Sequence, residues 1–335
     1  MNKYKIKNKV IGNSIFIIAE IGINHDGSLS KCKKLIKYAK KSGADAVKLQ
    51  ITNPQESYSI NTKSFRIFNK NLLKFNEIKK IKNYAKKLNI ILFATPGDFS
   101  SLEIVKKLNF PAIKISSGLL TNLPLIREAA KIKKPIILST GFSNLNEITE
   151  AVKTIKKFHN KIMILKCTSI YPAPNSSLNL LSIKTLQRKF KNVIGYSDHS
   201  LGDLACIVAV SLGAKIIEKH FTLNNKKSSA DHKISLIPKQ FKRMVEKIRD
   251  IEVCLGKENI FRTKYEEKQK KFYLRTLVAS SFIRKNQNFS SFNISLKRSN
   301  LKGPRLHPKN YYKILDKIAK KNIKKGELIR LDYVK

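Results

Sequence analysis

Short apolar runs alternate with longer stretches of helical periodicity from residue 15 to residue 254. Each run has the length and β-branched content of a buried strand, and the stretches between runs carry apolar residues at spacings of three and four. "SLSKCKKLIKYAKKSG", "NEITEAVKTIKKF" and "LGDLACIVAVSLGA" are examples of the helical stretches. The predicted strands span residues 15–21, 45–51, 89–95, 111–116, 135–140, 161–168, 192–197 and 214–221.

The number of these units indicates the fold class. Eight strand–helix units within about 250 residues are typical of a TIM barrel. An open doubly wound sheet is the alternative, but its usual nucleotide signal, GxGxxG after the first strand, is missing, and "EIGINHDG" does not supply it. We therefore predict an α/β fold, a (β/α)8 TIM barrel, for residues 1–256.

The alternation stops after Leu255. A charged helical stretch, "FRTKYEEKQKKF", lies in the segment 257–274, which we interpret as a linker. Residues 275–335 show short strands and at most one helix, and we predict that they form a small separate domain. A domain of about 60 residues is near the lower limit of independent stability, so we expect it to pack on the barrel or on a second subunit.

Composition favours a globular cytoplasmic protein. The chain has 42% hydrophobic and 27% charged residues, and no apolar run approaches the roughly 18 residues of a membrane span. The basic N-terminus leads into a short apolar run without a small-residue cleavage site, so we expect no secretory signal. The four cysteines are far apart and form no CxxC pair, which fits a reducing compartment.

The net charge is unusual, with 68 Lys and Arg against 23 Asp and Glu, a formal +45. Such a charge attracts polyanions non-specifically at low salt. The lysines are spread along the whole chain on helix faces, as in "KCKKLIKYAKK", without interleaved aromatic residues. We therefore expect no specific nucleic-acid partner, although a polyanion-binding barrel with a vestigial pocket remains one alternative.

Polar residues stand at the carboxyl ends of all the predicted strands, where a TIM barrel assembles its active site. A single polar residue there is ordinary, because loops are wet, but a carboxylate, lysines, hydroxyls and histidines on one rim favour a catalytic site. The residues are Glu20, Lys48, Gln50, Thr95, Lys114, Ser117, Ser139, Thr140, Thr168, Ser169, Ser197, Asp198, His199, Lys219 and His220.

His199 and His220 end neighbouring predicted strands, so their side chains are expected to converge. Two imidazoles with open coordination positions suit a catalytic divalent metal, and manganese, magnesium and cobalt all remain candidates. Asp231 and His232, just after the eighth strand, are candidates for a third ligand or for an outer partner.

Lys48 and Lys114 would be costly in a barrel mouth unless they met negative charge. With Thr95, Ser117, Ser139 and Ser197 they make a cluster of donors suited to a phosphate and a carboxylate on one small ligand. The alternative is that one lysine forms a Schiff base, as in an aldolase.

These residues, in this order, resemble the sialic acid synthase family, which includes N-acetylneuraminate, legionaminic acid and pseudaminic acid synthases. The resemblance rests on "IAEIGINHDGSL", "GADAVKLQ", "FATPGD", "IKISSGLLTNLPLI", "LKCTSIYPAPNSSLNL", "IGYSDHSLG" and "GAKIIEKHFTL". In the tail, "NIKKGELI" and "LKRSN" are similar to the antifreeze-like (SAF) domain of these enzymes.

The resemblance implies a transferase that condenses phosphoenolpyruvate with the aldehyde of an N-acetylated hexosamine. N-acetylmannosamine is the first expected acceptor, and a 2,4-diacetamido-trideoxyhexose is the alternative. His199 and His220 would bind manganese, Glu20 would manage the water that attacks C2, and Tyr171 and Asp231 would lie near sugar and metal. The implied phosphoenolpyruvate-binding residues are Lys48, Thr95, Lys114, Ser117, Ser139 and Ser197.

The resemblance also implies a homodimer in which the small domain of one subunit reaches the other and places Arg298 over the partner's sugar pocket. The sequence departs from the family at several substrate-binding positions. Leu119 replaces a glutamate that contacts sugar hydroxyls, which would favour a less polar sugar, and Ser169 replaces an asparagine near phosphoenolpyruvate. Ser299 and Asn300 replace a Pro-Gly pair after the arginine.

Overall fold

The computed structural model of the chain describes residues 4–226 and 229–335. The chain divides into two compact units, Met1–Gly256 and Lys257–Lys335, each with its own apolar core. In the described ranges no helix is both long enough and apolar enough to cross a bilayer.

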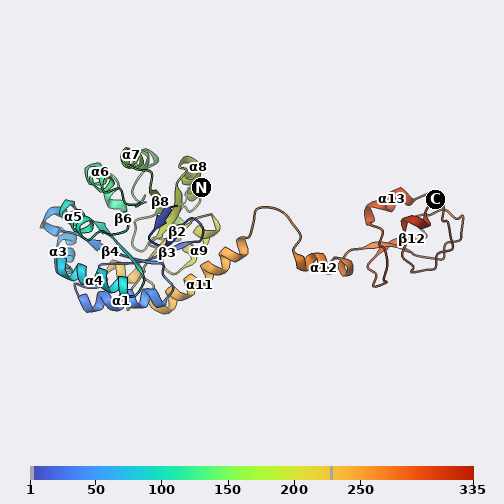
Figure 1. Cartoon of the computed structure of the whole chain (residues 1–335), viewed down its shortest axis with the longest axis horizontal. Helices are drawn as coiled ribbons and strands as arrows, with labels where there is room; N and C mark the ends of the chain where they lie inside the picture. The colour runs from blue at the N-terminus through green and yellow to red at the C-terminus, as the bar shows by residue number, and fades with distance from the viewer. Residues whose placement is uncertain (1–3, 227–228) are drawn as a thin grey trace. The chain divides into compact units, whose positions relative to one another are not determined.

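In the described part of the first unit, eight parallel strands, β3 to β10, close into a barrel (Figure 1). Neighbours along the chain are neighbours in the barrel, and β10 pairs with β3 to close it. The predicted TIM barrel is therefore confirmed. The strands are β3 (Phe16–Gly22), β4 (Ala46–Ile51), β5 (Ile91–Pro96), β6 (Ile113–Ile115), β7 (Ile136–Ser139), β8 (Ile162–Cys167), β9 (Val193–Asp198) and β10 (Ile216–His220).

Helices lie outside the strands (Figure 1). Their ends follow capping chemistry: the Ser28 side chain accepts from the Lys31 N–H at the start of α1, and Asn144 with Glu147 forms a capping box at the start of α7. The helices of this unit are α1 (Leu29–Lys41), α2 (Pro54–Ser57), α3 (Lys63–Lys70), α4 (Phe75–Lys87), α5 (Phe99–Lys107), α6 (Leu123–Lys131), α7 (Leu145–Lys156), α8 (Ser182–Lys189), α9 (Leu204–Ser211), α10 (Ala230–Ile234) and α11 (Pro238–Leu255), with 3₁₀ turns η1 (Ser117–Leu119) and η2 (Asn175–Ser177).

A hairpin of β1 (Tyr4–Ile6) and β2 (Lys9–Ile11) precedes the barrel. Ile6 and Ile11 are fully buried and belong to the barrel core. The sequence analysis did not predict this hairpin, because strands of three residues are too short to show a period of two among so many lysines.

The second unit contains α12 (Lys264–Tyr273), β11 (Thr276–Ala279), β12 (Ile294–Lys297), η3 (Pro308–Asn310), α13 (Tyr311–Ile314) and η4 (Leu331–Tyr333). The strands β11 and β12 pair in antiparallel fashion. A compact core that includes Leu277, Phe289 and Ile323 lies among these elements. The helix α12 occupies most of the segment that we interpreted as a linker.

Candidate active site

A cavity opens at the carboxyl ends of the barrel strands. Strands, loops and the 3₁₀ turn η1 all contribute side chains to it. Its lining residues are Glu20, Lys48, Gln50, Lys114, Ser116, Ser117, Gly118, Ser139, Phe142, Cys167, Ser169, Tyr171, Ser197, His199, Glu218 and His220. Most of the side chains predicted from the strand ends therefore meet in one place.

The strand period explains which side chains enter the cavity. In β10, Glu218 and His220 lie two residues apart and line the cavity, whereas Lys219 between them does not. The register places His220 opposite Glu20, Glu20 opposite Lys48 and Glu218 opposite Ser197. Paired residues of neighbouring strands face the same side, so these groups converge.

Two lysines and two glutamates form the charged centre of the cavity. Lys48 Nζ lies 2.9 Å from Glu20 Oε2 and 3.8 Å from Glu218 Oε1. Lys114 Nζ lies 3.5 Å from Glu218 Oε1. All four side chains are almost completely buried. The carboxylates therefore offset the lysine charges that would otherwise be costly there.

Hydroxyl groups complete this network. Lys114 Nζ donates to Ser139 Oγ at 2.6 Å, and Lys48 Nζ donates to Thr95 Oγ1 at 3.2 Å. The Ser197 hydroxyl donates to Glu218 Oε1 at 2.9 Å. These contacts hold both ammonium groups at defined points in the cavity.

Burial and charge shift the proton affinities in opposite directions. Burial raises the pKa of Glu20 to about 7, despite the opposing effect of Lys48. Burial opposes ionisation of Glu218 too, but Lys114 and Lys48 outweigh it and lower the pKa of Glu218. Burial lowers the pKa of Lys114. Glu20 is thus the cavity carboxylate that can gain or lose a proton near neutral pH.

The two predicted metal-binding histidines lie side by side. The ring centroids of His199 and His220 are 5.3 Å apart, and both side chains are buried. His199 Nδ1 is 2.9 Å from the Thr168 carbonyl oxygen, and its Nε2 is 3.0 Å from the Tyr171 hydroxyl. The Thr168 carbonyl requires the ring proton on Nδ1, which leaves a lone pair on Nε2 when the ring is neutral.

His220 is in a drier and more cationic position. Burial and the neighbouring His199 lower its pKa well below the usual value, so the ring is neutral at ordinary pH. Its Nδ1 has no hydrogen-bond partner among residues 4–226 and 229–335. A neutral imidazole is the form that binds a metal.

His199 and His220 together present two imidazole donors in the cavity. The described residues contain no cluster of three or more His, Cys, Asp or Glu side chains arranged to hold an ion. A pair of imidazoles leaves positions for water or substrate, as in open catalytic sites. We therefore find donors of a suitable kind in His199 and His220.

Cys167 also lines the cavity, 3.7 Å from His199 Nδ1 and 3.6 Å from Ser169 Oγ. Burial opposes ionisation of its thiol, but the contacts with His199 and the serines outweigh that effect and lower the pKa to about 7. The sequence analysis considered this cysteine only for its spacing.

Asp198 and Lys219 were on the predicted rim, but the structure places them outside the cavity. Lys219 Nζ lies 2.6 Å from Asp198 Oδ2, and both side chains are completely buried. Asp198 also accepts from the Tyr196 hydroxyl and the Ser200 N–H. The pair therefore fastens β10 to β9 and to the following loop.

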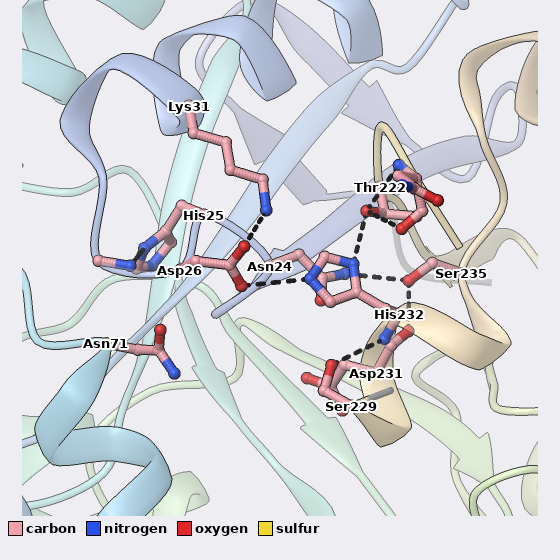
Figure 2. Close-up of polar contacts among 12 residues, drawn as sticks. Asn24, His25, Asp26, Lys31, Asn71, Thr222, Ser229, Asp231, His232 and Ser235 are labelled. Atoms are coloured by element: carbon pink, nitrogen blue, oxygen red, sulfur yellow. Dashed lines mark hydrogen bonds and ion pairs between the residues drawn. The ribbon is translucent and has the colours of Figure 1, made fainter. Parts of the chain in front are cut away.

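Asp231 and His232 follow one another in α10, but their side chains have different surroundings, and Figure 2 shows the contacts of His232. Asp231 is partly buried, and loss of hydration raises its pKa; it lies within electrostatic reach of His199 and Lys48. His232 instead contacts Thr222 Oγ1 through Nδ1 at 2.7 Å and Asp26 Oδ1 through Nε2 at 3.3 Å. Asp231 therefore belongs to the surroundings of the cavity, whereas His232 supports the neighbouring loops.

The remaining predicted residues have different positions. Leu119 ends η1 and packs against the barrel core, and it is not among the residues that line the cavity. Arg298 belongs to the second unit, where Nε donates to the Tyr273 carbonyl at 3.0 Å.

Glu218 is the main cavity residue that the sequence analysis missed. The signal was available, because Glu218 precedes His220 by two positions and a strand places such residues on the same face.

The fold and the cavity together define a class of protein: a TIM-barrel enzyme with a buried, charged cavity at the carboxyl ends of its strands. The chain belongs to the NeuB family, whose sequence pattern matches residues 35–260. It is 39% identical over 331 residues to the N,N'-diacetyllegionaminic acid synthase of Campylobacter jejuni subsp. jejuni, covering 94% of this chain and 98% of that protein. It is 36% identical over 334 residues to the pseudaminic acid synthase of the same organism, covering 94% of this chain and 95% of that protein.

A solved structure supports the same family assignment. The crystal structure of an N-acetylneuraminic acid synthetase from Leptospira borgpetersenii serovar Hardjo-bovis, in complex with citrate, has a TM-score of 0.78 and 33% identity. The similarity covers 81% of this chain and 96% of that one. The predicted family membership is therefore confirmed.

Proposed function

We propose that this enzyme condenses phosphoenolpyruvate with the open-chain aldehyde of an N-acetylated hexosamine and releases phosphate. The product is a nine-carbon 2-keto sugar acid, and N-acetylmannosamine is the first acceptor to test. One observation carries the proposal: in a chain of the NeuB family, two buried lysines, several hydroxyls and a histidine pair meet in one cavity.

A second acceptor class is a 2,4-diacetamido-trideoxyhexose. The relatives named as legionaminic and pseudaminic acid synthases favour it.

Lys48 and Lys114 bind the anionic groups of phosphoenolpyruvate in this proposal. Thr95 and Ser139, which already contact these ammonium groups, supply further donors beside them. Ser117, Ser169 and Ser197 provide additional hydroxyls on the same rim. The buried setting strengthens each charge-assisted hydrogen bond.

Glu20 handles the proton of the attacking water. C3 of phosphoenolpyruvate forms the new carbon–carbon bond with the aldehyde carbon as the C2–C3 double bond becomes single, the aldehyde oxygen takes up a proton to become a hydroxyl, and positive charge develops at C2. Water adds at C2 as Glu20 accepts one of its protons; the bond between C2 and the phosphate oxygen then breaks, phosphate leaves, and the new hydroxyl loses its proton to become the keto oxygen. A carboxylate with a pKa of about 7 is suited to this transfer near neutral pH. Tyr171 and Asp231 orient the sugar beside it.

His199 and His220 would hold a divalent cation, with manganese as the first choice. Such an ion polarises the aldehyde oxygen as a Lewis acid. The neutral His220 ring and the orientation of His199 by the Thr168 carbonyl support this assignment.

We further propose that the enzyme works in the cytoplasm as a homodimer. The described cysteines are all free, in keeping with a reducing compartment. Arg298 is the residue that the small domain would bring to the partner's sugar pocket.

Phosphate release from phosphoenolpyruvate tests the proposal. The purified protein is assayed with manganese or with chelator, across N-acetylmannosamine, its 6-phosphate and the diacetamido-trideoxyhexoses. We expect release that requires both the metal and one acceptor. If no acceptor supports phosphate release and borohydride traps pyruvate on Lys48 or Lys114, the aldolase alternative would be established instead.

A further inference from the structure

The segment of residues 221–236 leaves the end of β10 and returns to it. The Leu236 N–H donates to the His220 carbonyl oxygen at 2.9 Å, so the end of the segment is fastened next to its start. The short helix α10 lies within the segment and carries Asp231 and His232. The position of Asp231 therefore depends on how this segment is held.

The Asp231 carboxylate lies near Glu20, the residue that we assign to the attacking water. Gly22 follows Glu20 by two positions in β3 and has a φ of +53°. A Cβ on Gly22 would lie 3.0 Å from Glu20 Oε1 and 3.4 Å from Asp231 Oδ2. The two carboxylates thus flank the same backbone position, and a shift of Asp231 would change its distance from the reacting groups.

One connection holds the backbone of Asp231. Asn24, in the loop after β3, donates through Nδ2 to Ser235 Oγ at 3.0 Å (Figure 2). The Ser235 hydroxyl in turn donates to the carbonyl oxygen of Asp231. The side chains of Asn24 and Ser235 are both buried, so water does not compete for these hydrogen bonds. The relay therefore ties Asp231 to the loop after β3.

A second connection joins the same loop to the residue after Asp231. His232 Nε2 lies 3.3 Å from Asp26 Oδ1, and its Nδ1 lies 2.7 Å from Thr222 Oγ1 (Figure 2). A carboxylate only accepts hydrogen bonds, so Nε2 carries the proton that is donated to Asp26. The His232 ring is buried, and Thr222 keeps it oriented toward Asp26.

We call Asn24, Asp26, His232 and Ser235 the clasp. We infer that the clasp sets the affinity for the acceptor sugar by fixing the Asp231 carboxylate beside Glu20. None of the four is among the described residues that line the active-site cavity, so they are positioning residues rather than catalytic ones. The inference rests on the proposed function, in which Asp231 orients the sugar.

Two serine-to-alanine variants separate this role from a general loss of stability. Ser235→Ala removes the link between Asn24 and the Asp231 carbonyl. Ser57→Ala is the matched control, because Ser57 Oγ donates to Asp98 Oδ2 at 2.7 Å between the segments after β4 and β5, and neither residue lines the cavity. We expect Ser235→Ala to raise the acceptor KM about three- to tenfold, as for one lost hydrogen bond, with an unchanged phosphoenolpyruvate KM. Ser57→Ala should change neither KM.

Two replacements of His232 test the second connection. In His232→Asn the shorter amide falls near Nδ1, and the donor to Asp26 is lost. In His232→Gln the amide nitrogen falls near Nε2, and the donor is kept. We therefore expect the acceptor KM to rise in His232→Asn by about the same factor as in Ser235→Ala, and to stay near the wild-type value in His232→Gln.

Double variants identify the residue through which the clasp acts. In Asp231→Ala no carboxylate remains to be positioned. Adding Ser235→Ala or His232→Asn to Asp231→Ala should therefore change the acceptor KM by less than about twofold, because groups that act as one unit are not additive.

The outcomes are distinguishable. An acceptor KM that is unchanged in both Ser235→Ala and His232→Asn would overturn the inference. An equal rise of the phosphoenolpyruvate KM, or effects that multiply in full in the double variants, would overturn it as well. If His232→Asn does not fold, the comparison of Ser235→Ala with Ser57→Ala decides alone. Absence of turnover with every acceptor in the wild-type protein would overturn the proposed function itself, and this inference with it.

Discussion

Lys219 Nζ lies 2.6 Å from Asp198 Oδ2, with both side chains completely buried between β10, β9 and the loop after β9. A charge in such a position is tolerated only while its partner is present. Replacing Lys219 by Met leaves Asp198 buried with its charge uncompensated. We expect the free energy of unfolding to fall by about 3–5 kcal/mol, measured by urea denaturation.

The control for this prediction is Lys242→Met. Lys242 pairs with Glu246 at 3.7 Å on α11, and both side chains are more than half exposed. Exposed ion pairs on a helix contribute about 0.3–0.5 kcal/mol, so the free energy of unfolding of this variant should be close to that of wild type. An equal loss of free energy of unfolding in the two variants would show that the buried pair stabilises the fold no more than an exposed pair does.

Glu20 should govern the acidic limb of the pH profile. Burial raises its pKa to about 7, so its deprotonated fraction, and with it kcat/KM, should rise as pH increases through about 7. In Glu20→Gln the rate should fall at least about 100-fold, and the acidic limb of the pH profile should disappear. A profile for Glu20→Gln that keeps the limb would assign it to another group.

The same shift affects stability with a defined sign. The folded-state pKa of Glu20 lies above its ordinary value of 4.5, so the folded protein binds the proton more tightly. The stability that this tighter proton binding contributes is complete below about pH 4.5 and is lost as the pH rises through about 7. Wild type should therefore lose stability relative to Glu20→Gln over that range, and urea titrations at several pH values measure the difference.

His220→Ala should abolish phosphate release without unfolding the protein. It removes a candidate metal ligand at the end of a strand rather than a large part of the core. Calorimetric titration with manganese should show weaker binding than in wild type, and far-ultraviolet circular dichroism should be unchanged. His159→Ala, which alters a histidine bonded to the Lys161 N–H, is the matched control and should keep both properties. Full activity in His220→Ala would contradict the metal assignment.

Gly141 permits the close approach of two hydroxyls that we assign to substrate binding. A Cβ at this position would lie 2.1 Å from Ser169 Oγ and 2.7 Å from Ser117 Oγ. Gly141→Ala should therefore displace both serines and raise the phosphoenolpyruvate KM by about tenfold or more. A Cβ on Gly118, also in the cavity lining, would meet nothing within 4 Å, so Gly118→Ala should change the KM little.

Much of the barrel could be predicted from its sequence because strand and helix periods differ and alternate regularly. The convergence of Glu20, Lys48, Lys114 and the histidines followed from one rule, that barrel strands bring their carboxyl ends to one rim. The rule does not say which of two adjacent residues faces inward, and so Lys219 and Asp198 were placed on the rim although they face away from the cavity.

Features that depend on the exact packing could not be predicted. The partial burial of Leu119 against the barrel core could not be predicted from its position in the sequence. The role of Glu218 in holding both lysines depends on distances of a few ångströms between three strands. Periodicity carries no information at that scale.

The pairing of β10 with β3 has a consequence for how the protein is made. His220 lies opposite Glu20, so the catalytic cavity joins segments near the two ends of the barrel sequence. The ribosome must therefore synthesise nearly the whole barrel before either half of the site acquires its partner, and until then the strand edges of β3 and β9 are unpaired. Contacts of such long sequence separation form slowly, so a truncated or stalled chain should be inactive and prone to aggregate.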